Sequence, residues 1–208
     1  MRKTAVRLAP LLGAALLLGC DATAETVAPE RAQASGQRAA AVFAGGCFWC
    51  TEADFDKMPG VVSTTSGYIG GKLRNPTYEQ VSAGGTGHIE AVRVVYDPTR
   101  TNYATLASRF MRTIDPLDAG GSFCDRGYGY RSAFFVATPE QRRVAETLKA
   151  RAAVVLKKPV ATLVLPAATF YPAEGYHQDY YKKNPVRYRF YRHNCGRDAR
   201  LAELWGGK

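Results

Sequence analysis

A cysteine that follows an apolar run and two glycines is the first residue of this chain whose setting suits chemistry. Residues 41–44 predict a short buried strand, the glycines after it allow a sharp turn, and residues 47–56 favour a helix. Cys47 then lies at a helix N-terminus, where free backbone N–H groups and the positive end of the helix dipole stabilise a thiolate. We therefore predict that Cys47 is a nucleophile. A buried structural role is the alternative, but the glycine turn and the adjacent Phe48 and Trp49 favour the nucleophile.

The remaining cysteines leave several pairings open. Cys20 ends an apolar N-terminal run, so the folded part of the chain keeps Cys47, Cys50, Cys124 and Cys195. An oxidising compartment permits two structural disulfides among these four. We expect no zinc site, because one Cys-x-x-Cys pair occurs without a second pair or a histidine pair to complete it.

The spacing Cys47-x-x-Cys50 after a strand is also typical of thioredoxin-type enzymes, which gives a periplasmic thiol–disulfide oxidoreductase as an alternative function. That fold needs a cis-proline at the start of a strand opposite the motif. Thr138-Pro139 instead has the pattern of a helix start, with Thr as N-cap and Pro in the first turn. A lipoprotein that only binds a partner is a second alternative, but it has no need of a cysteine beside two aromatic residues.

Residues 1–19 have the composition of a secretory signal peptide. Three basic residues precede an apolar run over residues 8–18, which is too short to span a bilayer comfortably. The residues before Cys20 resemble the processing site of bacterial lipoproteins, so we expect Cys20 to become a lipidated first residue. The protein is then expected in the bacterial cell envelope, on the periplasmic side and anchored by lipid. Secretion with a free Cys20 is the alternative, because Leu18 is bulkier than most such sites carry.

Residues 20–38 are rich in Ala, Thr, Glu, Gln and Pro without apolar periodicity, which predicts a flexible tether. Residues 39–208 are long enough to form one domain with its own core. The formal net charge of +10 falls to +7 without the three basic residues of the signal peptide. Much of that charge alternates with aromatic residues in residues 182–200. In an exported protein this pattern favours a solvated basic face near anionic lipid over nucleic-acid binding.

The apolar patterns predict an α+β fold. Strands are expected at residues 41–44, 61–68, 89–96, 131–137 and 160–165, and helices at residues 47–56, 103–112 and 139–156. The first six elements have the order of the split βαβ, ferredoxin-like arrangement, so we predict a mainly antiparallel sheet with helices on one face. Residues 115–129 predict a long loop of the kind that is often functional. After Pro166 we expect a long irregular C-terminal tail with at most a short helix near residues 174–183, and this tail carries Cys195 on a mobile segment.

Five motifs at matching spacings resemble the A-type peptide methionine sulfoxide reductases over about residues 42–205. They are Gly46-Cys-Phe-Trp49, Pro76-Thr-Tyr78, Thr86-Gly-His-Ile-Glu90, Asp125-x-Gly-x-x-Tyr130-Arg-Ser132 and Glu174-x-x-His177-Gln-Asp-Tyr180. The resemblance implies an α/β roll, which is compatible with the predicted order of elements, and makes residues 39–208 the catalytic domain. The implied activity is reduction of methionine-S-sulfoxide, free or protein-bound, to methionine.

The resemblance also implies roles for individual residues. A thiolate attacks the sulfoxide sulfur while an acid protonates the oxygen, and these roles fall to Cys47 and Glu90. An isolated glutamate at a strand edge is usually a solvated charge, but burial among apolar neighbours would raise the pKa of Glu90 so that it holds a proton. The implied substrate-binding residues are Tyr78 and Tyr130 on the sulfoxide oxygen, Asp125 as an organiser of the site, and Phe48 and Trp49 as walls of the methyl pocket.

The implied cycle continues through a sulfenic acid on Cys47 and then a disulfide that a thioredoxin-like reductant reopens, without a metal or an organic cofactor. Cys50 and Cys124 stand where the family pattern has Gly and Asn. We favour Cys195 as the resolving cysteine, because mobility suits a step in which two sulfurs meet after product leaves. Cys50 and Cys124 are the alternatives. We expect a monomer whose partners are oxidised proteins or free methionine sulfoxide and the reductant.

Overall fold

The computed structural model describes residues 37–206. The predicted signal peptide, Cys20 and the predicted tether as far as residue 36 lie outside the described residues. Between residues 37 and 206, no helix has the length and apolar character that crossing a membrane requires.

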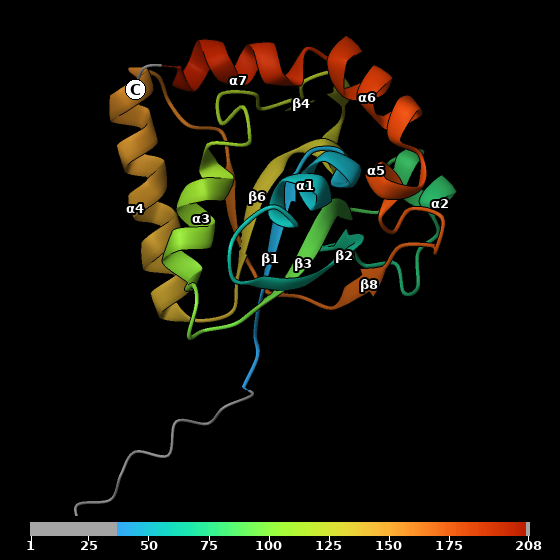
Figure 1. Ribbon diagram of the computed structural model, residues 1–208, viewed down its shortest axis with the longest axis horizontal. Coiled ribbons are helices and arrows are strands. Elements are labelled where there is room, and N and C mark those ends of the chain that lie inside the picture. Colours follow the sequence, from blue (N-terminus) through green and yellow to red (C-terminus); the bar gives the residue numbers. More distant parts are fainter. Residues whose placement is uncertain (1–36, 207–208) are drawn as a thin grey trace, which may run out of the picture. The chain divides into compact units, whose positions relative to one another are not determined.

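One six-stranded sheet forms the centre of the domain, with the strand order β7-β6-β1-β3-β2-β8 (Figure 1). The strands are β1 (Ala39–Gly45), β2 (Val61–Ile69), β3 (Ile89–Tyr96), β6 (Ser132–Val136), β7 (Leu163–Pro166) and β8 (Phe170–Pro172). β1 pairs antiparallel with both β3 and β6, and β2 pairs antiparallel with β3. β7 is parallel to β6 at one edge, and β8 is antiparallel to β2 at the other. The central order β6-β1-β3-β2 confirms the predicted ferredoxin-like arrangement.

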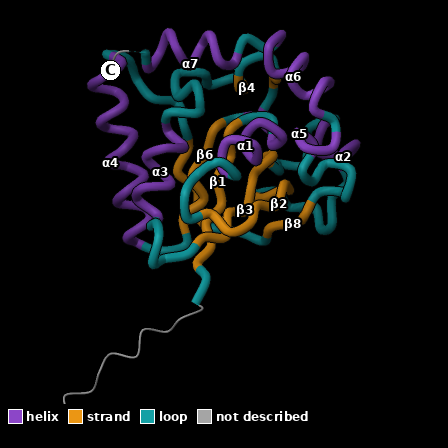
Figure 2. The backbone as a smooth tube through the Cα atoms, viewed as in Figure 1, coloured by secondary structure: helices purple, strands orange, loops and turns teal. Residues whose placement is uncertain are grey.

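Three helices cover one face of this sheet, namely α1 (Phe48–Phe55), α3 (Tyr103–Met111) and α4 (Pro139–Leu156), with α3 and α4 side by side (Figure 2). Phe43 of β1 lies at the centre of the core between them, and its ring is 4.8 Å from that of Phe55 and 5.1 Å from that of Phe110. The Thr138 side chain accepts a hydrogen bond from the Gln141 N–H at the start of α4. This confirms the helix start predicted from Thr138-Pro139.

The loop predicted over residues 115–129 contains short regular structure. β4 (Gly121–Ser122) and β5 (Asp125–Arg126) form a two-stranded hairpin, and a 3-10 turn follows at Tyr128–Tyr130. α2 (Tyr78–Ser82) is a further short helix, begun by a capping box at Thr77. Elements of two to five residues are too short to produce a hydrophobic period, which is why the sequence pattern does not predict them.

The prediction of an irregular C-terminal tail is wrong. After β8 the chain forms α5 (Tyr180–Lys183), α6 (Pro185–Asn194) and α7 (Arg197–Trp205), which run along one edge of the domain (Figure 1). α6 is basic and buries only Tyr188, so it has no apolar stripe to reveal it. α7 is held by tertiary contacts, because Trp205 is buried in the core and its Nε1–H donates to the Ile114 carbonyl at 3.3 Å. Cys195 and Gly196 therefore lie at a fixed junction between two helices.

Candidate active site

The turn before α1 places Cys47 as the sequence predicts. Gly46 has φ of +84°, and a Cβ atom there would lie 2.4 Å from the Ser122 Cβ, so only glycine fits. Cys47 is the N-cap of α1 and is 6% exposed. The same close approach brings the β4–β5 hairpin against the start of α1.

The first N–H group of α1 donates a hydrogen bond to a carboxyl group on the sheet. The Phe48 N–H donates to Glu90 Oε2 at 3.0 Å. Burial raises the pKa of the Cys47 thiol well above its usual range, and a hydrogen bond with Cys50 raises it further. The prediction that the helix N-terminus gives Cys47 a low pKa is therefore wrong for this arrangement, because burial and the Cys50 hydrogen bond outweigh the helix terminus.

Cys50 is the more acidic member of the cysteine pair. Its pKa is lowered to about 7, chiefly by the hydrogen bond from Cys47 and against the effect of burial. The positive charges of Arg197 and Arg192 lower it further. Arg197 is 2% exposed and donates to the carbonyls of Gly45 and Thr113 at 3.2 and 2.8 Å, so its charge is fixed beneath α1. The pair can hold one proton on Cys47 and the negative charge on Cys50.

Glu90 has the protonation that a general acid needs. It is the second residue of β3 and is 3% exposed. Burial raises its pKa to about 8, and the negative charge of Asp125 adds to this, whereas the Phe48 N–H and the Tyr130 hydroxyl act in the opposite direction. The prediction of a raised pKa is confirmed, and at neutral pH the carboxyl group is mostly protonated.

Tyr78 and Tyr130 lie on the same side of the site. The Tyr78 backbone N–H donates to Glu174 Oε1 at 2.8 Å, which fixes the start of α2 against the 174–178 segment. Burial raises the pKa of both phenols, and Glu90, when it is ionised, raises each further. Both hydroxyls therefore stay protonated and can donate hydrogen bonds to an oxygen atom held between them.

Trp49 and Phe48 differ in what they can contact. Trp49 stacks on Tyr180 with ring centroids 3.7 Å apart, and its Nε1–H donates to His177 Nδ1 at 3.0 Å. The Trp49 ring forms one wall of a surface groove. Phe48 is 1% exposed, packs on His177 and Tyr68, and does not line that groove. Of the two predicted walls, only Trp49 is reached from this side.

Tyr191 is a site residue that sequence reasoning missed. Its hydroxyl donates to Asp125 Oδ2 at 2.5 Å and also hydrogen-bonds the Cys47 side chain. Its ring meets Trp49 edge to face at 5.8 Å. The alternation of basic and aromatic residues in this stretch is visible in the sequence, but nothing in it indicates which aromatic ring turns inward.

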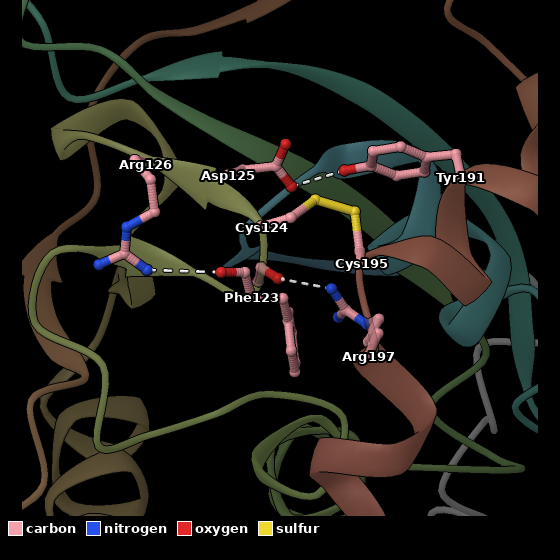
Figure 3. Close-up of a disulfide and its surroundings, with 8 residues drawn as sticks. Phe123, Cys124, Asp125, Arg126, Tyr191, Cys195 and Arg197 are labelled. Atoms are coloured by element: carbon pink, nitrogen blue, oxygen red, sulfur yellow. Dashed lines mark hydrogen bonds between the residues drawn. A yellow bond between two sulfur atoms is a disulfide. The ribbon is translucent and has the colours of Figure 1, made fainter.

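A disulfide joins Cys124 to Cys195, with Cα atoms 4.9 Å apart across 71 residues of chain (Figure 3). Cys124 is exposed at the tip of the β4–β5 hairpin, and Cys195 lies between α6 and α7. Phe123, the residue before Cys124, has φ of +57°, a conformation unusual for a bulky residue. Its ring lies 4.4 Å from the Arg197 guanidinium. Cys47 and Cys50 are free thiols. The sequence is compatible with several pairings of the four cysteines, and the structure contains this one.

The site offers little to a metal ion. Within residues 37–206, one cluster has ligand atoms close enough together, and it consists of Cys124, Asp125 and Cys195. Two of its three donors are joined in the disulfide and have no thiolate to contribute.

The chain matches the family described as peptide methionine sulfoxide reductase over residues 39–208. It is 52% identical over 198 residues to the peptide methionine sulfoxide reductase MsrA 2 of Caulobacter vibrioides, an alignment that covers 95% of this chain and 97% of that protein. Methionine sulfoxide reductase A of Corynebacterium diphtheriae has a similar structure, with 36% identity, a TM-score of 0.65, and 73% and 78% of the two chains covered. The reduced form of Mxr1 from Saccharomyces cerevisiae gives 29% identity and a TM-score of 0.68, with 72% and 87% covered.

Proposed function

The chain belongs to the peptide methionine sulfoxide reductase family and reduces methionine sulfoxide, and from this premise we propose that Cys47 attacks the sulfoxide sulfur while Glu90 protonates the oxygen. The observation that carries the assignment is the 3.0 Å hydrogen bond from the Phe48 N–H to Glu90 Oε2. It fixes a buried, protonated carboxyl group to the helix start that presents the nucleophile. A thiol and an acid held at one helix terminus can act on adjacent atoms of one substrate group.

In the first step the Cys47 sulfur forms a bond to the sulfoxide sulfur. Its proton passes to Cys50, which carries the negative charge of the pair. Glu90 supplies the proton that the oxygen needs, and transfer of that OH to Cys47 gives methionine and a Cys47 sulfenic acid. Tyr78 and Tyr130 hold the oxygen with their neutral hydroxyls. Methionine-S-sulfoxide, free or in a protein, is the proposed substrate.

The second step forms a disulfide inside α1. Cys50 is hydrogen-bonded to Cys47, so its thiol is the one already beside the sulfenic acid. Attack by Cys50 expels water and leaves a Cys47–Cys50 disulfide. The mobility that favoured Cys195 for this role is absent, because Cys195 lies at a helix junction and is bonded to Cys124. We therefore assign the first resolving step to Cys50.

Cys195 and Cys124 then act as an outer pair. With both thiols reduced, Cys195 attacks the inner disulfide at Cys50 and displaces the Cys47 thiolate. Cys124 next attacks Cys195 and releases Cys50, whose low pKa makes it a good leaving group. The result is two inner thiols and a Cys124–Cys195 disulfide, which is the combination found in this structure. Enzymes of this family take the two electrons from a thioredoxin-type dithiol without a cofactor.

The location of the enzyme rests on the N-terminal sequence. We propose that Cys20 is lipidated and anchors the domain at the periplasmic side of the cell envelope, which the composition of residues 1–19 supports. Metabolic labelling with a palmitate analogue, compared with a Cys20→Ala variant, tests the anchor.

The cycle is tested by counting methionine released by fully reduced, desalted enzyme from dabsyl-methionine-S-sulfoxide with no added reductant. Two dithiol pairs should give about two methionines per wild-type molecule, because each disulfide stores two electrons. Cys195→Ser should give about one, and Cys47→Ser none. One methionine from the wild type would remove the outer pair from the cycle, and none would refute the assignment of the reaction. Rapid reduction of insulin disulfides would support the thiol–disulfide oxidoreductase instead.

A further inference from the structure

A groove with a volume of about 490 Å³ runs along α6 and ends at the outer disulfide. Trp49 of the active site forms part of its lining, and the sulfur-bearing residues Cys124 and Cys195 form another. Cys124 is exposed, whereas Cys195 is partly covered. The groove therefore leads a large molecule to the exposed sulfur of Cys124.

One face of α6 makes the long wall of the groove. Arg187, Phe190, Tyr191 and Asn194 all line it, and their spacing of three, four and seven residues places them on one side of a helix. Phe190 is 70% exposed, and Val186 one turn before it is 72% exposed. Two large apolar side chains exposed in neighbouring turns are typical of a surface that another protein covers.

The charge around these apolar residues is positive. Within residues 37–206 the ion pairs of α6 use Arg192, which contacts Asp54 and Asp198. Arg187 and Arg189 have no carboxylate partner in that part of the chain. A protein that docks here should therefore present an apolar patch with neutral or acidic surroundings.

We propose that this groove is the docking surface of the thioredoxin-type reductant, and that the reductant attacks Cys124. The proposal rests on the outer pair proposed above. The occupant follows from the disulfide itself, because a reductant must bring its thiolate into line with an exposed sulfur of a bond that ends the groove. An oxidised protein substrate would need Cys47, and Tyr191 lies between Cys47 and this groove, because its ring lines the groove while its hydroxyl hydrogen-bonds Asp125 and the Cys47 side chain.

The exchange is balanced in two displacements. The reductant thiolate bonds to the Cys124 sulfur, the Cys124–Cys195 bond breaks, and Cys195 leaves as a thiolate. Cys195 lies directly before α7, whose positive N-terminal end favours the departing charge. The second thiol of the reductant then attacks its own partner sulfur, releases the Cys124 thiolate and leaves the reductant as a disulfide. Two electrons have moved to the enzyme, and protons from solvent complete both thiols.

The first experiment compares two reductants in matched variants. Phe190→Glu puts a charge in the groove, and Val154→Glu puts the same charge at a similarly exposed apolar residue outside it, 77% exposed on α4. For Phe190→Glu the ratio of kcat/KM with thioredoxin to kcat/KM with dithiothreitol should fall about tenfold or more. Val154→Glu should leave that ratio unchanged. An unchanged ratio in Phe190→Glu, or a raised KM only for an oxidised protein substrate, would overturn the docking surface.

The second experiment identifies the sulfur that is attacked. Oxidised wild-type enzyme is mixed with a thioredoxin variant that keeps only its attacking cysteine, so that the mixed disulfide cannot resolve. Peptide mapping should find thioredoxin on Cys124, and an adduct on Cys195 would contradict the proposal. Absence of dithiothreitol-supported reduction in the wild type would instead mean that the proposed reaction has failed, so the two failures are distinguishable.

Discussion

Replacement of Glu90 by glutamine tests both whether Glu90 donates a proton in the reaction and whether burial raises its pKa. The amide keeps the size of the side chain and can still accept the Phe48 N–H, but it has no proton to transfer. Loss of a general acid typically slows a reaction about 10²–10⁴-fold, which corresponds to roughly 3–5 kcal/mol of transition-state stabilisation. Formation of methionine in a single turnover should slow by that factor.

The same substitution should also make the protein increasingly more stable than the wild type as pH rises. The pKa of Glu90 is raised from 4.5 to about 8, so the folded state holds a proton that the unfolded chain releases. Between these values the unfolded state binds fewer protons, and wild-type stability falls as pH increases. At 1.36 kcal/mol per unit, the loss between about pH 5 and pH 9 is at most roughly 4 kcal/mol. The Glu90→Gln variant has no such group, so its stability relative to the wild type should rise across this window.

The two effects are measured by rapid-quench single turnover and by urea unfolding at several pH values. Glu52→Gln is the matched control, since Glu52 is 1% exposed in the same region, and burial raises its pKa to about 7. Its carboxyl group accepts the Asp179 N–H at 2.9 Å. The stability of Glu52→Gln relative to the wild type should also rise with pH. Its single-turnover rate should stay within a few-fold of the wild-type rate.

Two results would refute this reasoning. Normal single-turnover rates in Glu90→Gln would make the carboxyl group a bystander. A slow variant whose stability difference from the wild type stays flat with pH would show that Glu90 is ionised in the folded protein and cannot be the acid.

Three further outcomes are expected. The S epimer of methionine sulfoxide should be consumed and the R epimer left on chiral chromatography, because separate groups receive the oxygen, sulfur and methyl; equal loss of both would contradict this. Cys50→Ser should accumulate a sulfenic acid that dimedone traps on Cys47, and normal cycling with no trapped adduct would exclude Cys50 as the first resolver. Tyr191→Phe leaves Asp125 without its 2.5 Å partner and should lower the unfolding free energy by about 1 kcal/mol, whereas unchanged urea unfolding would argue against that bond.

Much of the fold follows from local patterns. The alternation along residues 89–96 predicts β3, and Thr138-Pro139 predicts the start of α4. Both signals depend only on residues that are close together in the sequence, so they can be recognised without the structure. The raised pKa of Glu90 is predictable for a similar reason, since apolar residues on both sides of it indicate a buried strand.

The parts that escaped prediction depend on contacts between distant residues. The pKa of Cys47 is raised chiefly by burial, and the Cys50 hydrogen bond raises it further. The burial depends on elements distant in the sequence, so no local pattern predicts it. In the β4–β5 hairpin turn, Phe123 has a positive φ, a conformation for which glycine is the usual residue. Its position makes sense only beside Arg197, more than seventy residues later, whose guanidinium lies over the ring.

Arg197 links the inner and outer cysteine pairs physically. It follows Cys195 by two residues, yet its guanidinium donates hydrogen bonds to the carbonyls of Gly45, two residues before Cys47, and Thr113, after α3. Its charge lowers the pKa of Cys50 and opposes the rise that burial causes in the pKa of Asp125. This buried anchor and Trp205 hold α7 to the core independently of the outer disulfide. α6 has anchors of its own, because Arg192 pairs with Asp54 and the Tyr191 hydroxyl contacts Asp125 and the Cys47 side chain. The helices on both sides of Cys195 are therefore tied to the residues around the inner cysteine pair.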